Sequence, residues 1–163
     1  MTSTIESSTY RQILGHYPTG ICAITAIQEN GTPTAMIVGS FTSVSLDPPL
    51  VAFLPSKTSS SWKKIEGCSG FCVNVLADEQ EDLCRTLSSK DPEKFKDVPH
   101  HLSKSGTPIL DGALAWIDCK FHDIHEAGDH YIAIGEVREL DIHHSGTPLL
   151  FHKGAYGKIS PLL

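Results

Sequence analysis

Residues 34–57 read TAMIVGSFTSVSLDPPLVAFLPSK, and this stretch decides the fold of the chain. Its first part alternates β-branched and aromatic residues with small polar ones, which predicts one strand running to about residue 45. Residues 47–49 (Asp-Pro-Pro) predict a turn, because proline has no amide hydrogen for a central ladder and disfavours helix in the residue before it. A second apolar strand, residues 50–54, follows at once. We therefore expect two paired strands joined by a tight turn.

Hydroxyl side chains are concentrated along these strands and just after them. Ser40, Thr42 and Ser43 lie on the first strand. The second strand runs into a polar cluster made of Ser56, Lys57, Thr58, Ser59, Ser60 and Ser61. A lysine beside backbone amides commonly holds phosphate, although serine-rich segments are also ordinary turns. The pattern predicts a seat for a flat aromatic ligand with a phosphorylated tail, and a plain turn remains the alternative.

Length and charge limit the class of protein. A chain of 163 residues buries roughly 70% of its unfolded surface, so we expect a single domain over residues 1–163. The net charge is -6 without a basic run, so neither nucleic acid nor an anionic membrane is an expected partner. We find no membrane-span or signal-peptide pattern in the sequence. Five cysteines without a C-x-x-C pair favour reduced thiols and a cytoplasmic location.

The remaining segments predict short helices and antiparallel strands. The helices are expected over residues 7–14, over residues 62–65 and from residue 78, and the further strands over residues 21–27, 71–76, 113–124, 131–142 and 148–152. Asn30-Gly31 predicts a hairpin between the first two strands of the chain, because both residues tolerate positive φ. Residues 88–108 are expected to be mainly loop. Hairpin links exclude a doubly wound parallel sheet, so we predict a mainly β, antiparallel Greek-key fold that closes into a small barrel.

The histidines raise the question of a metal. His122 and His125 are three residues apart in a predicted strand, so their side chains point to opposite faces and cannot share one ion without a bulge. We therefore expect no metal site. His130 follows Gly128-Asp129 at the start of a strand and is the histidine with a candidate role.

The ordered set of short motifs resembles one known family. The motifs are Pro18-Thr19-Gly20, SFTSVSLDPPLV at residues 40–51, FCVNVL at residues 71–76, Gly128-Asp129-His130 with Gly135-Glu136-Val137, and Pro148-Leu149-Leu150-Phe151 with Gly154 and Tyr156. In this order and spacing they are similar to the flavin reductases with an FMN-binding split-barrel fold, which serve as reductase components of two-component flavin monooxygenases. The resemblance spans residues 13–159.

This resemblance implies a homodimer of split barrels that bind FMN or FAD, with NADH or NADPH as hydride donor and a separate monooxygenase as partner. Ser40, Thr42 and Ser43 would line the flavin ring and ribityl chain. The phosphate end would be held by Ser56, Lys57, Ser59 and Ser61. His130 and Tyr156 match positions on the nicotinamide side of the flavin. His130 is the candidate catalytic residue, and we expect it to position the nicotinamide instead of acting as an obligatory base.

The sequence departs from the family pattern before the Phe-Thr-Ser motif. Met36, Ile37 and Gly39 belong to the expected cofactor-binding set, but residues 37 and 39 lack the hydrogen-bonding side chains usual in the family. Contacts there are expected through the backbone or not at all. FMN versus FAD and NADH versus NADPH therefore stay open.

Hydride transfer between stacked rings is mainly a positioning task, which agrees with the lack of an obvious triad or carboxylate pair. The sequence therefore predicts an NAD(P)H:flavin oxidoreductase that supplies reduced flavin to a partner monooxygenase. One alternative is a split-barrel protein that binds flavin tightly, for electron transfer or binding without free-flavin turnover. Another is a non-flavin barrel whose histidines bind a metal or a partner protein.

Overall fold

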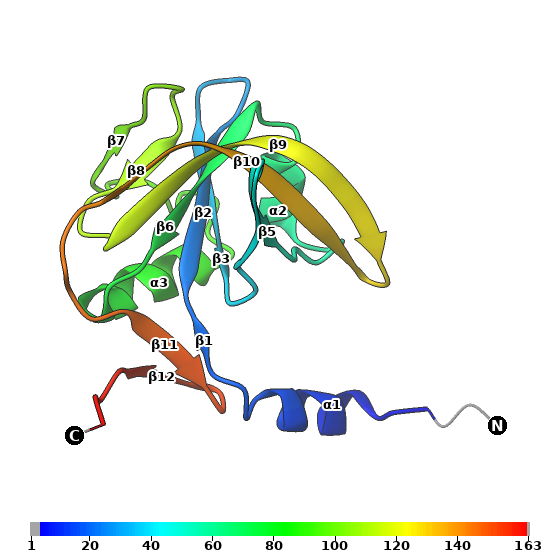
Figure 1. Cartoon of the computed structure of the whole chain (residues 1–163). Helices are drawn as coiled ribbons and strands as arrows, with labels where there is room; N and C mark the ends of the chain where they lie inside the picture. The colour runs from blue at the N-terminus through cyan, green and yellow to red at the C-terminus, as the bar shows by residue number, and fades with distance from the viewer. Residues whose placement is uncertain (1–3, 163) are drawn as a thin grey trace.

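The computed structural model describes residues 4–162, and one antiparallel sheet of seven strands dominates it (Figure 1). The strands are β2 (Cys22–Ile27), β3 (Pro33–Val38), β4 (Thr42–Leu46), β5 (Pro49–Phe53), β6 (Gly70–Val75), β9 (Ala115–Ala127) and β10 (His130–Ile142). Their order across the sheet is β3-β2-β6-β9-β10-β5-β4. The predicted mainly β class, the first hairpin and the turn at Asp47-Pro48-Pro49 are confirmed.

The sheet curls because its two edge strands are neighbours in the sequence. β3 and β4 form the opposite edges, yet only residues 39–41 separate them along the chain. Four peptide steps span at most about 14 Å, so the edges must approach each other. Within residues 4–162 no ladder joins β3 to β4. The barrel is therefore split, as the resemblance implied, and only the expectation of a closed barrel from the strand pattern is wrong.

The break between β3 and β4 also corrects the prediction of one strand to residue 45. A Cβ atom added at Gly39 would lie 2.8 Å from the Thr19 hydroxyl oxygen, so the chain approaches β1 (Thr19–Gly20) closely at this point. The Ser40 hydroxyl oxygen then accepts a hydrogen bond from the Leu54 amide at 2.9 Å. These contacts draw residues 39–41 away from the ladder of β3 and across to β5.

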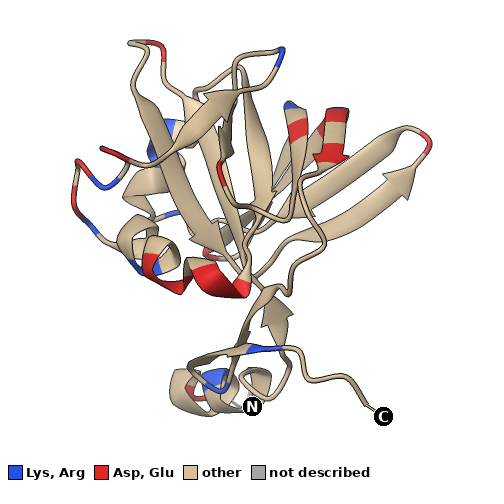
Figure 2. Cartoon of the chain, turned by 90° about the vertical axis from the view of Figure 1, so that its left-hand side faces the viewer, with Lys and Arg blue, Asp and Glu red and all other residues tan. Residues whose placement is uncertain are grey.

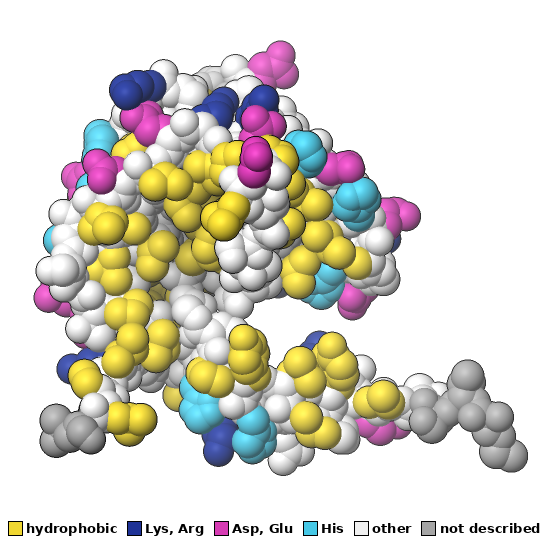
Figure 3. Space-filling model, in the orientation of Figure 1, with side chains coloured by type: hydrophobic (Ala, Val, Ile, Leu, Met, Phe, Trp, Pro, Cys, Tyr) yellow, Lys and Arg dark blue, Asp and Glu magenta, His cyan; other side chains and the backbone are white. Residues whose placement is uncertain are grey.

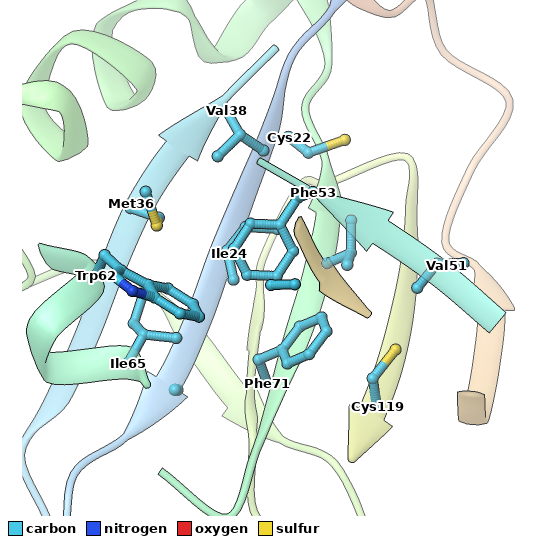
Figure 4. Packing of buried hydrophobic residues seen from close by; sticks show 13 residues of the cluster. Cys22, Ile24, Met36, Val38, Val51, Phe53, Trp62, Ile65, Phe71 and Cys119 are labelled. Carbon is cyan, nitrogen blue, oxygen red and sulfur yellow. The ribbon is translucent and has the colours of Figure 1, made fainter. Parts of the chain in front are cut away.

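Aromatic packing fills the interior of the curled sheet. The ring of Phe53 packs edge-on against Trp62 of α2 (Ser60–Ile65) and against Phe71 of β6, with ring centroids 5.8 and 5.1 Å apart (Figure 4). All three side chains are fully buried. Edge-on aromatic pairs add about 0.5–1.5 kcal/mol each to the free energy of burial. This cluster fixes α2, and hence the hydroxyl residues that begin it, against the barrel.

A second apolar cluster lies under α3 (Glu81–Ser88), which follows a 3₁₀ turn, η1 (Asp78–Gln80). Cys84 and Leu87 are the buried residues of α3. The segment expected as loop at residues 88–108 contains turns and the first strand of a hairpin, β7 (His100–Leu102) with β8 (Pro108–Leu110). The hairpin is secondary structure that the sequence did not predict.

The β7–β8 hairpin is tied to the sheet by a buried carboxylate. Asp118 is 1% exposed and accepts hydrogen bonds from Arg138 Nε at 2.9 Å and from the hydroxyl of Thr107 at 2.5 Å. The hydroxyls of Ser103 and Ser105 also donate to it. A charge this deeply buried is tolerated only when it is paired and fully hydrogen-bonded, so it fixes the hairpin at one position on the sheet.

An arm projects from the barrel (Figure 1). It consists of α1 (Ser7–Leu14) and a small sheet of β1, β11 (Leu149–His152) and β12 (Ala155–Lys158). α1 buries none of its residues, and Gly15 ends it as predicted. Figure 3 shows a hollow between α1 and the barrel, with apolar side chains of α1 facing it. None of the helices in the described part of the chain has the length and apolar composition needed to cross a membrane.

Candidate functional site

Two adjoining cavities lie along β3, where the sequence predicted the ligand seat. The larger, with a volume of about 610 Å³, is called the polar cavity; it is lined by Met36, Ile37, Thr58, Ser59, Ser60, Ser61, Leu87, Ser88, Ser89, Lys90 and Lys94. The smaller, of about 170 Å³, is called the apolar cavity; it is lined by Thr19, Ile21, Ile37, Val38, Gly39, Cys84, Phe151 and Tyr156. Ile37 lines both, so the two cavities are neighbours along β3.

The polar cavity is formed by the start of α2 and the segment after α3. Ser59 caps α2, since its hydroxyl oxygen accepts a hydrogen bond from the Trp62 amide at 3.1 Å. Lys94 reaches across from the other side, and its Nζ donates to the Ser61 hydroxyl at 2.9 Å. Burial, with the nearby Lys64 charge, lowers the pKa of Lys94 below its usual 10.5. An anion in this cavity would therefore relieve an unfavourable ammonium environment.

Basic residues are scattered over the protein instead of forming one basic face (Figure 2). Lys90 and Lys94 are thus set apart by their position at a cavity that also presents several hydroxyl groups. Two ammonium groups beside serine hydroxyls form a donor set suited to phosphate oxygens.

Lys57 does not line either cavity, although it belongs to the same polar cluster in the sequence. Its Nζ lies 3.2 Å from a carboxylate oxygen of Glu126 and 5.3 Å from the centre of the Tyr131 ring. Its amide donates to the Asp129 carbonyl at 3.0 Å. Ser56, next to it, forms an isolated bridge with His130. Lys57 and Ser56 therefore do not line the polar cavity as Ser59 and Ser61 do, although the Ser56 hydroxyl lies 3.0 Å from that of Thr58, which lines it.

The hydroxyl residues that were predicted to line the flavin ring also lie outside the two cavities. The Ser40 hydroxyl oxygen accepts a hydrogen bond from the Leu54 amide. Thr42 and Ser43 are exposed on the edge strand β4, and neither lines the two cavities. Met36, Ile37 and Gly39, which belong to the predicted cofactor-binding set, do line them.

The apolar cavity is bounded by the arm on one side and by α3 on the other. Tyr156 of β12 and Phe151 of β11 face each other edge-on, with ring centroids 5.4 Å apart. Buried Cys84 and half-buried Ile37 complete an apolar lining. Such a lining suits the face of a planar aromatic ring, because it removes apolar surface from water on both partners.

His130 lies at the tip of the long β9–β10 hairpin, outside both cavities. Its Nδ1 is 2.7 Å from a carboxylate oxygen of Asp129. This hydrogen bond and the charge of His130 lower the pKa of the exposed Asp129 carboxyl. The hairpin tip thus presents an imidazole that is hydrogen-bonded to Asp129 and does not line the apolar cavity.

Several residues of the site were missed in the sequence. Lys90 and Lys94 come from a segment that was expected to be mainly loop, and Cys84 was expected only as part of the helix that begins at residue 78. Nothing in the spacing of these residues links them to β3. Phe151 stood in a recognised motif but had no assigned role.

An apolar cavity beside a hydroxyl-lined cavity with two lysines fits a planar ring with an anionic tail. A flavin nucleotide has this construction, so the residues present fit the cofactor that the resemblance implies. Thr58, Ser59, Ser61, Lys90 and Lys94 would hold the phosphate-bearing tail. Ile37, Phe151 and Tyr156 would contact the ring.

The comparisons with known proteins agree with this fit. Residues 14–160 match the family described as "Flavin reductase like domain". The chain belongs to this family. Flavin reductase from Pseudomonas putida is 54% identical over 155 residues, which cover 95% of this chain and 91% of the relative.

A second related sequence and a solved structure are also similar to this chain. The reductase subunit HsaB of a flavin-dependent monooxygenase from Rhodococcus jostii is 45% identical over 157 residues, covering 96% of this chain and 80% of the relative. The structure of NADH:FAD oxidoreductase from Streptomyces globisporus in complex with NAD and FAD fragments has a TM-score of 0.89 and 31% identity, covering 96% of this chain and 94% of that chain.

Proposed function

We propose that this chain is an NAD(P)H:flavin oxidoreductase, which transfers a hydride from a reduced nicotinamide to FMN or FAD and supplies reduced flavin to a separate monooxygenase. The observation that carries the proposal is the pair of neighbouring cavities, one apolar and one with hydroxyls and two lysines, that share Ile37 in their linings. The printed names of the relatives, a flavin reductase and a monooxygenase reductase subunit, support the same activity and partner.

A bound flavin supplies the hydride acceptor, so the protein's own task is to position two ligands. The apolar lining around Ile37, Phe151 and Tyr156 excludes water and restricts a ring to one orientation. The hydroxyls and lysines of the polar cavity anchor a phosphate and so fix how far the ring enters. Holding reacting atoms roughly 3–3.5 Å apart is the main requirement for hydride transfer, and it needs no nucleophile or metal.

Within this function, Lys94 is our candidate for the cation that contacts the flavin phosphate. Its ammonium lies at the cavity and already bonds to Ser61, whereas Lys57 is paired with Glu126. The assignments of Ser40, Thr42, Ser43 and Ser56 to the flavin, and of His130 to the nicotinamide, stay predictions. Each of these side chains lies outside the two cavities of a single protomer.

The proposal includes a homodimer, which is supported by the exposed arm. Tyr10, Ile13 and Leu14 of α1 are 57%, 62% and 50% exposed, and their helix buries none of its residues. An amphipathic helix of eight residues is too short to be stable alone in water, so it needs a packing partner. A second copy of the chain placed in the hollow beside α1 would supply one (Figure 3).

We also propose a cytoplasmic location. All five cysteines are free, and burial raises the pKa of Cys22, Cys72 and Cys119 to about 12. Unpaired thiols of this kind are usual in a reducing compartment.

A steady-state matrix of NADH and NADPH against riboflavin, FMN and FAD tests the proposed function. A reductase oxidises the nicotinamide over many turnovers in proportion to the free flavin added. A protein that only carries flavin shows oxidation equal to its bound flavin and then stops. Purified protein with no measurable affinity for any of the three flavins would overturn the proposal.

A further inference from the structure

The polar cavity offers more space than the tail of FMN needs. Its volume is about 610 Å³. The roughly one dozen non-hydrogen atoms of a ribityl phosphate fill at most about 400 Å³, even if each atom is given the volume of about 30 Å³ that a water molecule occupies in the liquid. With the flavin ring in the neighbouring apolar cavity, the tail of FMN would therefore leave a large part of the polar cavity to solvent.

A first group of hydrogen-bond donors lies at the start of α2. The Nζ of Lys94 donates to the Ser61 hydroxyl oxygen at 2.9 Å, and both residues line the polar cavity. Because the Ser61 hydroxyl accepts this bond, its own hydrogen is free to donate to a ligand. An ammonium and a hydroxyl are thus held together at this side of the cavity, where they can bind one phosphate group.

A second group of donors lies at the end of α3. Ser89 and Lys90 follow this helix directly and line the same cavity. The Ser89 hydroxyl oxygen accepts a hydrogen bond from the Asp91 amide at 3.4 Å, so its hydrogen is also free to donate. The polar cavity therefore has a lysine with a serine hydroxyl at the start of α2 and another such pair at the end of α3.

The charges of the two cavity lysines are not balanced by the protein, although the chain has a net charge of -6. Within residues 4–162 the lysines and arginines in ion pairs with carboxylates are Lys57, Arg85, Lys104, Lys120 and Arg138, so neither Lys90 nor Lys94 is among them. A phosphate monoester concentrates its charge at one point. A diphosphate places one negative charge on each of two linked phosphates, so it can pair with both lysines at once.

We propose that the polar cavity receives the diphosphate and adenosine of FAD, and that the chain prefers FAD to FMN. The phosphate next to the ribityl chain binds Lys94 and Ser61, and the phosphate next to the adenosine binds Lys90 and Ser89. The adenosine occupies the remaining volume of the cavity. The inference rests on the proposed function and goes further, because it selects one flavin and assigns each lysine its own phosphate.

Isothermal titration of the full-length protein with riboflavin, FMN and FAD tests the preference without turnover. We expect the Kd of FAD to be about tenfold lower than that of FMN, which a second charged contact and the added packing of the adenosine together allow. Riboflavin, which lacks both phosphates, should bind more weakly than either.

Variants at Lys90 test the assignment of the second phosphate. Lys90→Met should raise the Kd of FAD about threefold, as a charged contact at an exposed position allows, and should change the Kd of FMN less than twofold. Lys90→Arg keeps the charge and should restore FAD binding. Lys94→Met should instead weaken FMN and FAD alike, because both ligands contain the first phosphate.

The matched control is Lys96→Met. Lys96 belongs to the same segment, is exposed and does not line the polar cavity. Its replacement removes the same charge from the protein, so it corrects for any general electrostatic effect on anionic ligands. We expect it to leave the Kd of FMN and the Kd of FAD unchanged within twofold.

The outcomes distinguish this inference from the proposed function. A wild-type protein that binds and reduces no flavin overturns the proposed function and the inference with it. A wild type that reduces flavins over many turnovers but binds FMN as tightly as FAD overturns the inference alone. The same holds if Lys90→Met weakens FMN and FAD equally, which would place both lysines on one phosphate, or if it leaves FAD binding unchanged.

Discussion

Two lysines approach the same run of serines from different directions, and they are in unlike environments. Lys57 follows Ser56 directly in the sequence, but its ammonium is paired with Glu126 on the long hairpin. Lys94 is more than thirty residues away from the serines in sequence, yet it bonds to Ser61 and lines the polar cavity. The first lysine is near the cluster along the chain, and the second is near it in space.

The difference has an electrostatic side as well. Glu126 partly neutralises Lys57, so an incoming phosphate would compete with a carboxylate. Within residues 4–162 the ammonium of Lys94 has only a neutral hydroxyl as its hydrogen-bond partner, and burial disfavours its charge in the free protein. Of the two, Lys94 therefore gains more from an anionic ligand.

The largest expected effect is that of Lys94→Met on phosphorylated flavins. A hydrogen bond to a charged group contributes about 1.5–3 kcal/mol, and solvent at a half-buried site favours the lower end. We expect the Kd of FMN to rise about tenfold, which corresponds to 1.4 kcal/mol. Riboflavin, which has no phosphate, should bind as before. Fluorescence titration of both ligands measures the difference, and equal weakening of the two would exclude a phosphate contact.

The pH dependence of FMN affinity should sharpen the contrast further. The pKa of Lys94 is lowered, so in the free protein the ammonium is lost at a lower pH than for an ordinary lysine. FMN binding should therefore weaken as the pH rises through this lowered pKa, by less than tenfold. Riboflavin binding should stay level over the same range. In Lys94→Met the two ligands should show the same profile, and a persistent FMN-specific slope would point to another group.

Ser61→Ala removes the hydroxyl that Lys94 contacts, and its effect should be smaller. A neutral hydrogen bond contributes about 0.5–1.5 kcal/mol, so the Kd of FMN should rise about threefold. Ser60→Ala is the matched control, because Ser60 lines the same cavity but is not the partner of Lys94. If Ser60→Ala weakens FMN more than Ser61→Ala does, the Lys94–Ser61 pair is not the anchor.

The sequence predicted what depends on local patterns. The alternation around Ile37, the turn at Pro48 and the Asn30-Gly31 hairpin each follow from backbone chemistry within a few residues, and the structure contains all three. The order of motifs also led to the correct family. What failed locally was the strand after Val38, because its end is decided by the packing of Thr19 against Gly39 from a distant segment.

The site was predicted less completely than the fold. Ser59 and Ser61 were predicted from the hydroxyl cluster and the family resemblance, and the start of α2 brings both to the polar cavity. Lys90 and Lys94 reach the polar cavity through tertiary packing of the segment after α3, and no spacing in the sequence encodes that approach. The signal for a phosphate contact in the sequence was a lysine next to serines, and this signal led to the prediction of Lys57.

The smallest expected effect is that of Lys57→Met on flavin binding. Because Lys57 is paired with Glu126 outside the cavities, we expect the Kd of FMN and of riboflavin to change less than twofold. Exposed ion pairs contribute about 0–1 kcal/mol, and this one, with 31% and 76% exposed side chains, should shift the thermal midpoint only slightly. Glu126→Gln breaks the same pair from the other side and should have the same small effect on stability. If Lys57→Met instead weakens FMN tenfold and spares riboflavin, the phosphate lies at the hairpin and not beside Lys94. The flavin would then run along β5 and past Ser56, and the role proposed for the polar cavity would have to be given up.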